Sequence, residues 1–238
     1  MSEIVTTADI TVRLVQQCGS DSTVIAAAKA STEGSASVER LEQDAKTGLL
    51  RFLMRQRHGV PWEHTLFTWT VHAPIFVFRE LVKHRIGVSI SEHSARYSEV
   101  EPVFWVPPHG RKIKPVEGYK PARPEFVEDE RVRGFAFYEM HDAYITAWDS
   151  YKNMLTDGVA KEVARSILPV GTYSFAYVTM NCRSLMAFLA LRTHDPKANH
   201  PSYPQAEIEQ VARQMESDFE RLYPISYSAF NEFGRECP

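Results

Sequence analysis

Hydrophobic and polar residues alternate along this chain with two periods, and the longer period dominates. Apolar residues three or four positions apart predict helices with one buried face. The clearest example runs from Ser37 to His58 and is ended by Gly59 and Pro61. Further helices are predicted at residues 22–30, 75–84, 125–155, 160–168, 181–192 and 205–223.

Four shorter segments rich in β-branched and aromatic residues predict strands, and they span residues 10–15, 67–71, 103–106 and 172–179. Residues 107–124 contain five prolines and two glycines with little periodicity, so this stretch is predicted to be a loop. Long helices interleaved with a few strands indicate an α+β fold. At 238 residues the chain can form that fold as a single domain, 1–238.

The composition is that of an ordinary globular protein, with 44% apolar and 24% charged residues. No run of about 18 apolar residues occurs, and the first residues lack the basic and apolar regions of a signal peptide. We therefore expect a cytoplasmic protein without a membrane partner. The net charge of -3 gives no general attraction to nucleic acid, so none is expected. Cys18, Cys182 and Cys237 are widely spaced and are predicted to be free thiols.

The segment from Lys83 to Ser98 carries the most unusual composition in the chain. It contains three cations, two histidines, one carboxylate and four serines directly after an apolar helix. Arginine and serine side chains satisfy the oxygens of a phosphate by charge-assisted hydrogen bonds. Ser94 and Arg96 would face one way if this segment were extended. A solvated, charge-balanced loop is the alternative interpretation of the same composition.

Two arginines end otherwise apolar patterns. Arg192 completes a helical stripe that begins at Asn181, and Arg165 precedes an apolar turn. A cation at such a place is paired, lies at a ligand, or is favoured by the negative end of the helix dipole. Cys182, in the first turn of the same helix, has either a lowered thiol pKa or a purely structural role. The sequence leaves these alternatives open.

Two other kinds of site are not indicated. His58 and His64 lack the spacing of a zinc helix, and Pro61 breaks the helix between them, so no metal is expected. The glycine patterns that announce a dinucleotide or a phosphate-binding loop are also missing from the sequence.

Five short motifs in one order resemble the flavin-dependent thymidylate synthases, the thymidylate synthase complementing protein family. They are His58-x-x-Pro61-x-Glu63-His64, Ala73-Pro74-Ile75-Phe76-Val77-x-Arg79, His84-Arg85 with Glu92-x-Ser94-x-Arg96-Tyr97, Ala164-Arg165-x-x-Leu168-Pro169, and Asn181-x-Arg183-Ser184-Leu185 through Leu191-Arg192. The similarity covers residues 58 to 192 well and the two ends loosely. Five ordered matches are much more specific than any single one.

The resemblance implies an α+β fold with a central, mostly antiparallel sheet flanked by long helices. It also implies an enzyme, a methyltransferase that makes dTMP from dUMP with methylenetetrahydrofolate as one-carbon donor and NADPH as reductant, through bound FAD. The family's proteins are homotetramers whose sites combine several subunits, so a homotetramer is expected here.

Carried over by motif, the resemblance assigns two sets of residues. Those expected to contact FAD are His58, Val60, Lys83, His84, Arg85, Glu92, Asn181, Arg183 and Ala187. Those expected to contact dUMP are Glu80, Lys83, Glu92, Ser94, Ala95, Arg96, Arg165 and Arg192. Arg192 is the expected catalytic residue, because a cation on the uracil edge stabilises negative charge in the ring and makes C5 more electron-rich.

This chain departs from the family pattern in four places. Lys83 stands where Arg is usual, Val60 where Ser or Thr is usual, and Ala187 replaces a polar residue. One extra residue also lies between Arg85 and Ser94, and it must bulge out if Glu92 and its neighbours are to keep their places. These departures keep two alternatives open: a related flavin-dependent pyrimidine-nucleotide methylase or hydroxymethylase, and a non-catalytic nucleotide-binding homologue.

Overall fold

The chain folds into helices and strands that fall into two compact units. The computed structural model describes residues 3–33, 43–116, 124–127 and 129–238. Unit 1 comprises residues 1–11, 72–80 and 92–176, and unit 2 comprises residues 12–71, 81–91 and 177–238. The prediction of a single domain stays a prediction.

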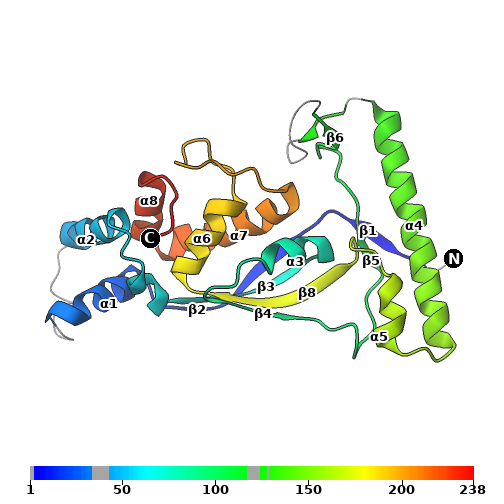
Figure 1. The fold of residues 1–238 in the computed structure, drawn as a ribbon, viewed down its shortest axis with the longest axis horizontal. Helices are drawn as coiled ribbons and strands as arrows, with labels where there is room; N and C mark the ends of the chain where they lie inside the picture. The colour runs from blue at the N-terminus through cyan, green and yellow to red at the C-terminus, as the bar shows by residue number, and fades with distance from the viewer. Residues whose placement is uncertain (1–2, 34–42, 117–123, 128) are drawn as a thin grey trace. The chain divides into compact units, whose positions relative to one another are not determined.

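A four-stranded sheet in the order β2-β3-β8-β4 is built from strands far apart in sequence (Figure 1). Its strands are β2 (Thr11–Cys18), β3 (Leu66–Pro74), β8 (Tyr173–Met180) and β4 (Val88–Glu92). Thr68 bonds Thr179, whereas His72, further along β3, packs on Tyr173, earlier along β8. The pairing therefore runs in opposite directions, as expected for antiparallel strands.

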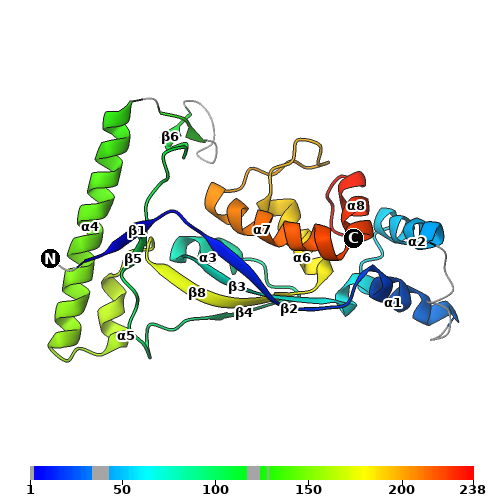
Figure 2. The ribbon, with the colours of Figure 1, turned by 180° about the vertical axis from the view of Figure 1, so that it is seen from behind.

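Helices form much of unit 2 (Figure 2). They are α1 (Asp21–Glu33), α2 (Gln43–Arg55), α6 (Cys182–Arg192), α7 (Ala206–Leu222) and α8 (Pro224–Glu232), with the short 3-10 helix η3 (Val60–His64). Their core includes the fully buried Trp62, Trp69 and Phe219. The indole N–H groups of both tryptophans are hydrogen-bonded: Trp62 donates to Ser226 and Trp69 to Asp218, each at 2.9 Å.

Unit 1 is organised by the long helix α4 (Glu130–Thr156). Its other elements are α3 (Ile75–Leu81, with Leu81 itself in unit 2), α5 (Lys161–Ala164), η4 (Arg165–Ile167), the parallel pair β1 (Val5–Thr7) and β5 (Val103–Trp105), and the antiparallel pair β6 (Lys114–Pro115) and β7 (Pro124–Glu125). Phe104 stacks on Tyr144 at 4.8 Å, beside Trp148 and Tyr151, so the core of unit 1 is mainly aromatic.

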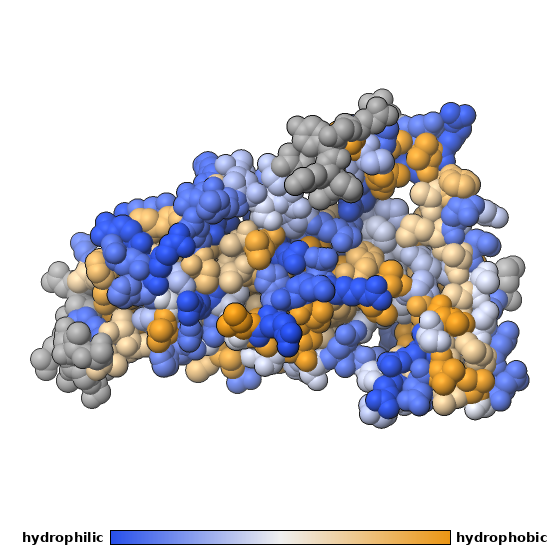
Figure 3. Space-filling model, viewed as in Figure 1, coloured by the Kyte–Doolittle hydropathy of each residue, from blue (hydrophilic) through white to orange (hydrophobic). Residues whose placement is uncertain are grey.

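The first half of α4 keeps apolar side chains at the surface. Val132, Phe135, Phe137 and Tyr138 are exposed, and Figure 3 shows apolar surface over this helix. The same helix buries Tyr144, whose hydroxyl donates to the Trp105 carbonyl at 2.8 Å and whose pKa burial raises to about 12. The second half of α4 therefore has a face in the core of unit 1, whereas its first half exposes apolar side chains.

The predicted α+β class is confirmed, and most predicted elements are present. The helix expected over 75–84 is wrong at its end, because α3 stops at Leu81 and the His84 amide then donates to the Leu81 carbonyl at 3.1 Å in a turn. Strands β1 and β4 and helix α8 were not predicted. The predicted loop 107–124 contains β6 and the start of β7. The helix predicted over 125–155 is wrong at its start, because Glu125 is in β7 and α4 begins at Glu130. Residues 37–42 of the first predicted helix, 117–123 of the loop and 128 of the long helix lie outside the described residues.

The described cysteines are free, as predicted. Cys182 is fully buried, and this burial raises its thiol pKa, so the structural alternative for Cys182 holds. Among the helices that the structure describes, none is long and apolar enough to cross a membrane.

Candidate functional site

The cationic turn after α3 lies against the first turn of α6 in unit 2. The chain reverses at Gly87, whose φ of 66° is left-handed. Ser184 donates its hydroxyl hydrogen to the Ile86 carbonyl at 2.8 Å, and a Cβ at Gly87 would come within 2.2 Å of that hydroxyl. Only glycine fits there without moving Ser184. The turn that carries Lys83 and Arg85 is thereby fixed beside the start of α6.

Arg192, at the last position of α6, is bonded to His84. Its Nε donates to His84 Nε2 at 3.0 Å, and the His84 ring meets Phe188 edge-on with centroids 4.9 Å apart. Both Arg192 and His84 are half-buried. The residue assigned to the uracil and one assigned to the flavin are thus direct partners in this structure.

The first turn of α6 carries two more residues of the flavin set. Asn181 is the predicted N-cap: its Oδ1 accepts from the Ser184 amide at 2.8 Å. Arg183 pairs with Glu63 and donates from Nε to the Pro238 carbonyl at 2.8 Å. The pairing with Glu63 is the main cause of the raised pKa of Arg183.

The remaining flavin residues of unit 2 differ in character. His58 is exposed and lies 6.3 Å from the Phe52 ring, Val60 is 61% exposed, and Ala187 is partly buried. Exposed Lys83 and Arg85 with a helix N-terminus suit a diphosphate, and exposed apolar and imidazole surface suits a ring system. The residues present therefore fit a flavin dinucleotide, although Val60 and Ala187 can offer only backbone or apolar surface.

A cavity of ≈ 130 Å³ in unit 1 gathers three residues of the nucleotide set. Glu92, Ala95 and Arg165 line it together with Ile75, His93, Val100, Leu168, Thr172, Tyr173 and Ser174. Arg165 stands at the start of η4, directly after α5, and is half-buried. A cation at the wall of a small cavity of mixed polar and apolar lining is suited to an anionic ligand.

Residues 94–97 form a turn, which corrects the expectation of an extended segment. The Tyr97 amide donates to the Ser94 carbonyl at 3.1 Å, and the Arg96 amide to Ser94 Oγ at 3.4 Å. The Arg96 side chain pairs with Glu162 at 3.1 Å. Ser94 and Arg96 are thus brought close by a local turn, and a phosphate there would share Arg96 with Glu162.

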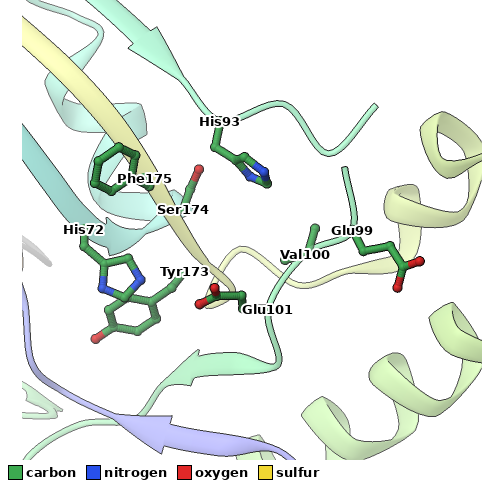
Figure 4. A pocket seen from close by; sticks show the side chains of 8 residues that line it. All are labelled: His72, His93, Glu99, Val100, Glu101, Tyr173, Ser174 and Phe175. Carbon is green, nitrogen blue, oxygen red and sulfur yellow. The ribbon is translucent and has the colours of Figure 1, made fainter. Parts of the chain in front are cut away.

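A second cavity of ≈ 290 Å³ adjoins the first, because His93, Val100, Tyr173 and Ser174 line both. Figure 4 shows its other lining residues, which are His72, Glu99, Glu101 and Phe175. Burial lowers the pKa of His72, with a smaller opposing effect from Glu101, and its ring packs on Tyr173 at 4.9 Å. His93 Nε2 lies 2.5 Å from the hydroxyl of Ser98.

Sequence reasoning missed this second group of polar residues. The predicted strand 67–71 ended one residue before His72, whereas β3 continues to Pro74 with alternating burial. Extending that alternation would have placed His72 on the partly exposed face of the strand.

The predicted site residues divide between the two units. Unit 1 contains Glu80, Glu92, Ser94, Ala95, Arg96 and Arg165, and unit 2 contains His58, Val60, Lys83, His84, Arg85, Asn181, Arg183, Ala187 and Arg192. Glu80 is half-buried in α3. Within the described residues, no group of three or more histidine, cysteine, aspartate or glutamate side chains could hold a metal ion.

Comparisons with known proteins agree with the motifs. The profile described as "Thymidylate synthase complementing protein" matches residues 13–225. A flavin-dependent thymidylate synthase of Streptomyces avermitilis is 47% identical over 233 residues, covering 97% of this chain and 94% of that protein. One from Tropheryma whipplei is 44% identical over 232 residues, covering 97% and 95%.

A solved structure is also similar. The UMP/dUMP methylase PolB from Streptomyces cacaoi, bound with 5-Br dUMP, matches with a TM-score of 0.90 and 42% identity, over 99% of this chain and 100% of that one. A second structure of PolB holds 5-Br UMP and matches with a TM-score of 0.89. A profile match over most of the chain and near full-length relatives above 40% identity agree, so this chain belongs to the thymidylate synthase complementing protein family.

Proposed function

We propose that this chain is a flavin-dependent thymidylate synthase, a methyltransferase that converts dUMP to dTMP. The observation that carries the proposal is near full-length similarity to enzymes of that name, at 44–47% identity. The cavity in unit 1 adds support, because Glu92, Ala95 and Arg165, expected from the motifs to contact dUMP, line one small cavity. A non-catalytic homologue is therefore disfavoured.

The nucleotide phosphate is bound by cations and hydroxyls of unit 1 in this proposal. Arg165 at the cavity wall supplies one charge, and the turn at Ser94 presents a hydroxyl and the backbone of Ala95. Arg96 supplies a second charge, which Glu162 otherwise neutralises. Charge-assisted hydrogen bonds of this kind are about twice as strong as neutral ones.

Arg192 activates the pyrimidine. A guanidinium on the uracil edge stabilises the negative charge that spreads over the ring as C5 becomes nucleophilic. The guanidinium of an arginine also offers a planar fork of N–H donors to the acceptor atoms of the uracil edge. No acid–base pair on the protein is required for this role.

The flavin, FAD, is held by the surface of unit 2 around the start of α6. Lys83, Arg85 and Arg183 offer charge to its diphosphate, and His58 and Val60 offer exposed surface to its rings. When bound, FAD supplies hydride that it has received from NADPH. Methylenetetrahydrofolate donates the one-carbon unit. These two co-substrates and a homotetramer with shared sites follow from the family. They stay predictions, as does the cytoplasmic location expected from the sequence.

The decisive experiment is an anaerobic incubation of FAD-loaded protein with dUMP, methylenetetrahydrofolate and NADPH, with dTMP measured by chromatography. We expect dTMP, and we expect Arg192→Ala to lower its rate by about 10²-fold or more while flavin stays bound. Bound flavin without dTMP in the full mixture would exclude thymidylate synthesis.

A second candidate substrate is UMP. The similar structure of PolB binds 5-Br UMP as well as 5-Br dUMP, at 42% identity to this chain. Replacing dUMP by UMP in the same assay, with 5-methyl-UMP as product, decides between the two substrates. A kcat/KM for UMP within about tenfold of that for dUMP would make the enzyme a methylase of both nucleotides.

A further inference from the structure

We infer that His84 is a positioning residue for Arg192: it holds the guanidinium at the orientation in which the uracil edge is recognised. The inference rests on the role of Arg192 in the proposed function. It assigns to His84 an action on the nucleotide half of the reaction, whereas the family motif assigns His84 to the flavin.

The contact between the two side chains is specific in both direction and atoms. Arg192 Nε lies 3.0 Å from His84 Nε2, within the usual range of a hydrogen bond. Arginine has donors only, so His84 Nε2 must be the acceptor and the imidazole must be uncharged at that nitrogen. The same ring packs edge to face with Phe188, one turn before Arg192 on α6; the centroids are 4.9 Å apart and the ring planes meet at 82°. The contact with Phe188 orients the His84 ring, and Nε2 of that ring then orients the Arg192 guanidinium.

The backbone below Arg192 is already fixed, so the side chain is what remains to be ordered. Thr193, the next residue, is 2% exposed and donates its hydroxyl hydrogen to the Leu189 carbonyl at 2.6 Å. Arg235 Nη2 donates to the same hydroxyl at 2.8 Å and to Glu216 Oε1 at 2.6 Å. A long arginine side chain on this rigid base still has several rotatable bonds, and the bond from Nε to His84 restrains the bonds up to the guanidinium plane.

The orientation of that plane matters for recognition. A guanidinium binds two acceptor atoms as a flat fork, which a point charge such as lysine cannot reproduce. Catalytic groups must be held within a fraction of an ångström of their productive place, and a misplacement of about 1 Å can cost about 10²-fold in rate. A partner that fixes Nε therefore affects turnover and nucleotide affinity even if it never touches the nucleotide.

Two substitutions separate the hydrogen bond from the ring packing. His84→Gln retains an acceptor at the end of a side chain of similar reach and loses the ring. His84→Phe retains a ring to pack on Phe188 and loses the acceptor. His109→Phe is the matched control, because His109 is 80% exposed and belongs to neither predicted site set.

The proteins are compared as FAD-loaded full chains. For each we measure flavin content, kcat and KM for dUMP, and dUMP affinity by calorimetry, alone and combined with Arg192→Ala. We expect His84→Phe to lower kcat/KM by about tenfold or more with flavin retained, and His84→Gln to restore most of it. On the Arg192→Ala background, His84→Phe should change dUMP affinity by less than about twofold, because its effect acts through Arg192.

The outcomes are distinguishable. The inference is overturned in favour of ring packing alone if His84→Phe has near-parental kcat/KM and dUMP affinity. It is also overturned if His84→Phe is fully active while His84→Gln loses activity. The inference also fails if His84→Phe weakens dUMP binding equally in the parental and the Arg192→Ala background. It fails likewise if the loss of activity in His84→Phe is in proportion to a loss of bound flavin. The affinity cycle needs no turnover, so a parent that binds dUMP but makes no dTMP defeats the proposed synthase and leaves this test intact.

Discussion

The buried ion pair between Arg235 and Glu216 is the feature of unit 2 whose removal has the most predictable consequence. Both side chains are almost fully buried, with relative exposures of 4% and 6%. Arg235 donates to Glu216 Oε1 at 2.6 Å, to Thr193 at 2.8 Å and to Asn231 at 2.5 Å. Its guanidinium also lies 5.0 Å from the centroid of the Phe230 ring. The pair joins the last residues of the chain to α7, and the bond to Thr193 joins them to the end of α6.

We predict that Arg235→Met destabilises the fold by about 3 kcal/mol. Removing one partner of a buried pair typically costs about 3–5 kcal/mol, since the other charge stays buried. Glu216 keeps a second cation here, Arg213, at 2.8 Å, and this places the cost at the lower end. For a chain of this length, about 3 kcal/mol corresponds to a fall in Tm of roughly 6–12 °C.

The assay is urea and thermal unfolding followed by circular dichroism, with the m-value checked for a change in the transition. Arg221→Met is the control, because its ion pair with Asp218 on α7 is 60% exposed on the arginine side. Exposed pairs contribute less than about 1 kcal/mol. The double substitution Arg235→Met with Glu216→Met should recover part of the loss, because the buried carboxylate that has lost Arg235 is gone, although Arg213 then keeps only Glu209.

The result that refutes this reasoning is a loss in Arg235→Met no larger than that in Arg221→Met. The buried pair would then contribute no more than a surface pair, and the hydrogen bonds to Thr193 and Asn231 would have to be replaceable by water.

Three further predictions follow from single residues. Lys83→Ala should weaken FAD and dUMP binding, and Lys83→Arg should tighten it through a bidentate geometry; titrations at low and moderate salt measure both, and unchanged affinities in the alanine variant contradict the motif assignment. A thiol reagent at pH 8 should label exposed Cys18 rapidly and spare buried Cys182 until the protein is unfolded, as mass spectrometry would show. Burial lowers the pKa of His72 below its ordinary value of 6.5, so the unfolded chain binds a proton at this residue more tightly than the folded chain does. The free energy of unfolding should therefore fall as the pH drops below about 6.5. Urea titrations at pH 7.5 and 5.5 measure this fall, and His72→Gln should make it smaller.

The sequence predicted elements whose signals are local. Asn181 caps α6 and Gln205 precedes α7, as expected from side-chain chemistry and periodicity within a few residues. Helix α8 was not predicted because its first turn is stabilised by a residue far away in the sequence. The buried carboxylate of Asp21 accepts hydrogen bonds from the Ile225 amide at 2.8 Å and the Ser226 amide at 3.0 Å. No periodicity near residue 224 reveals a partner 200 positions away in the chain.

Strand β4 was not predicted for a different reason. Val88 and Ile90 are half-buried while Ser89 and Ser91 are exposed, which is a period of two. The serines and neighbouring cations made these residues resemble a phosphate-binding loop. The composition was therefore interpreted first, and the alternation of apolar and polar residues was not interpreted as a strand. Part of the candidate site was predictable in the same limited sense, since the motifs named Glu92, Ala95 and Arg165 but nothing local named His72.

The extra residue that the motifs predict between Arg85 and Ser94 lies in a stretch held at both ends. Before it, the Ile86 carbonyl is held by Ser184 at 2.8 Å; after it, the His93 amide donates to the Phe175 carbonyl at 2.7 Å. Between these two anchors the chain makes a left-handed turn at Gly87 and then the uninterrupted strand β4, Val88–Glu92. The side chain of Ile86 is 92% exposed, so the turn projects into solvent. An exposed turn with glycine accepts an added residue at little cost, whereas a bulge in β4 would break strand pairing. We therefore predict that the extra residue expected from the motifs lengthens the turn at Ile86 and Gly87, while the two anchors stay in place.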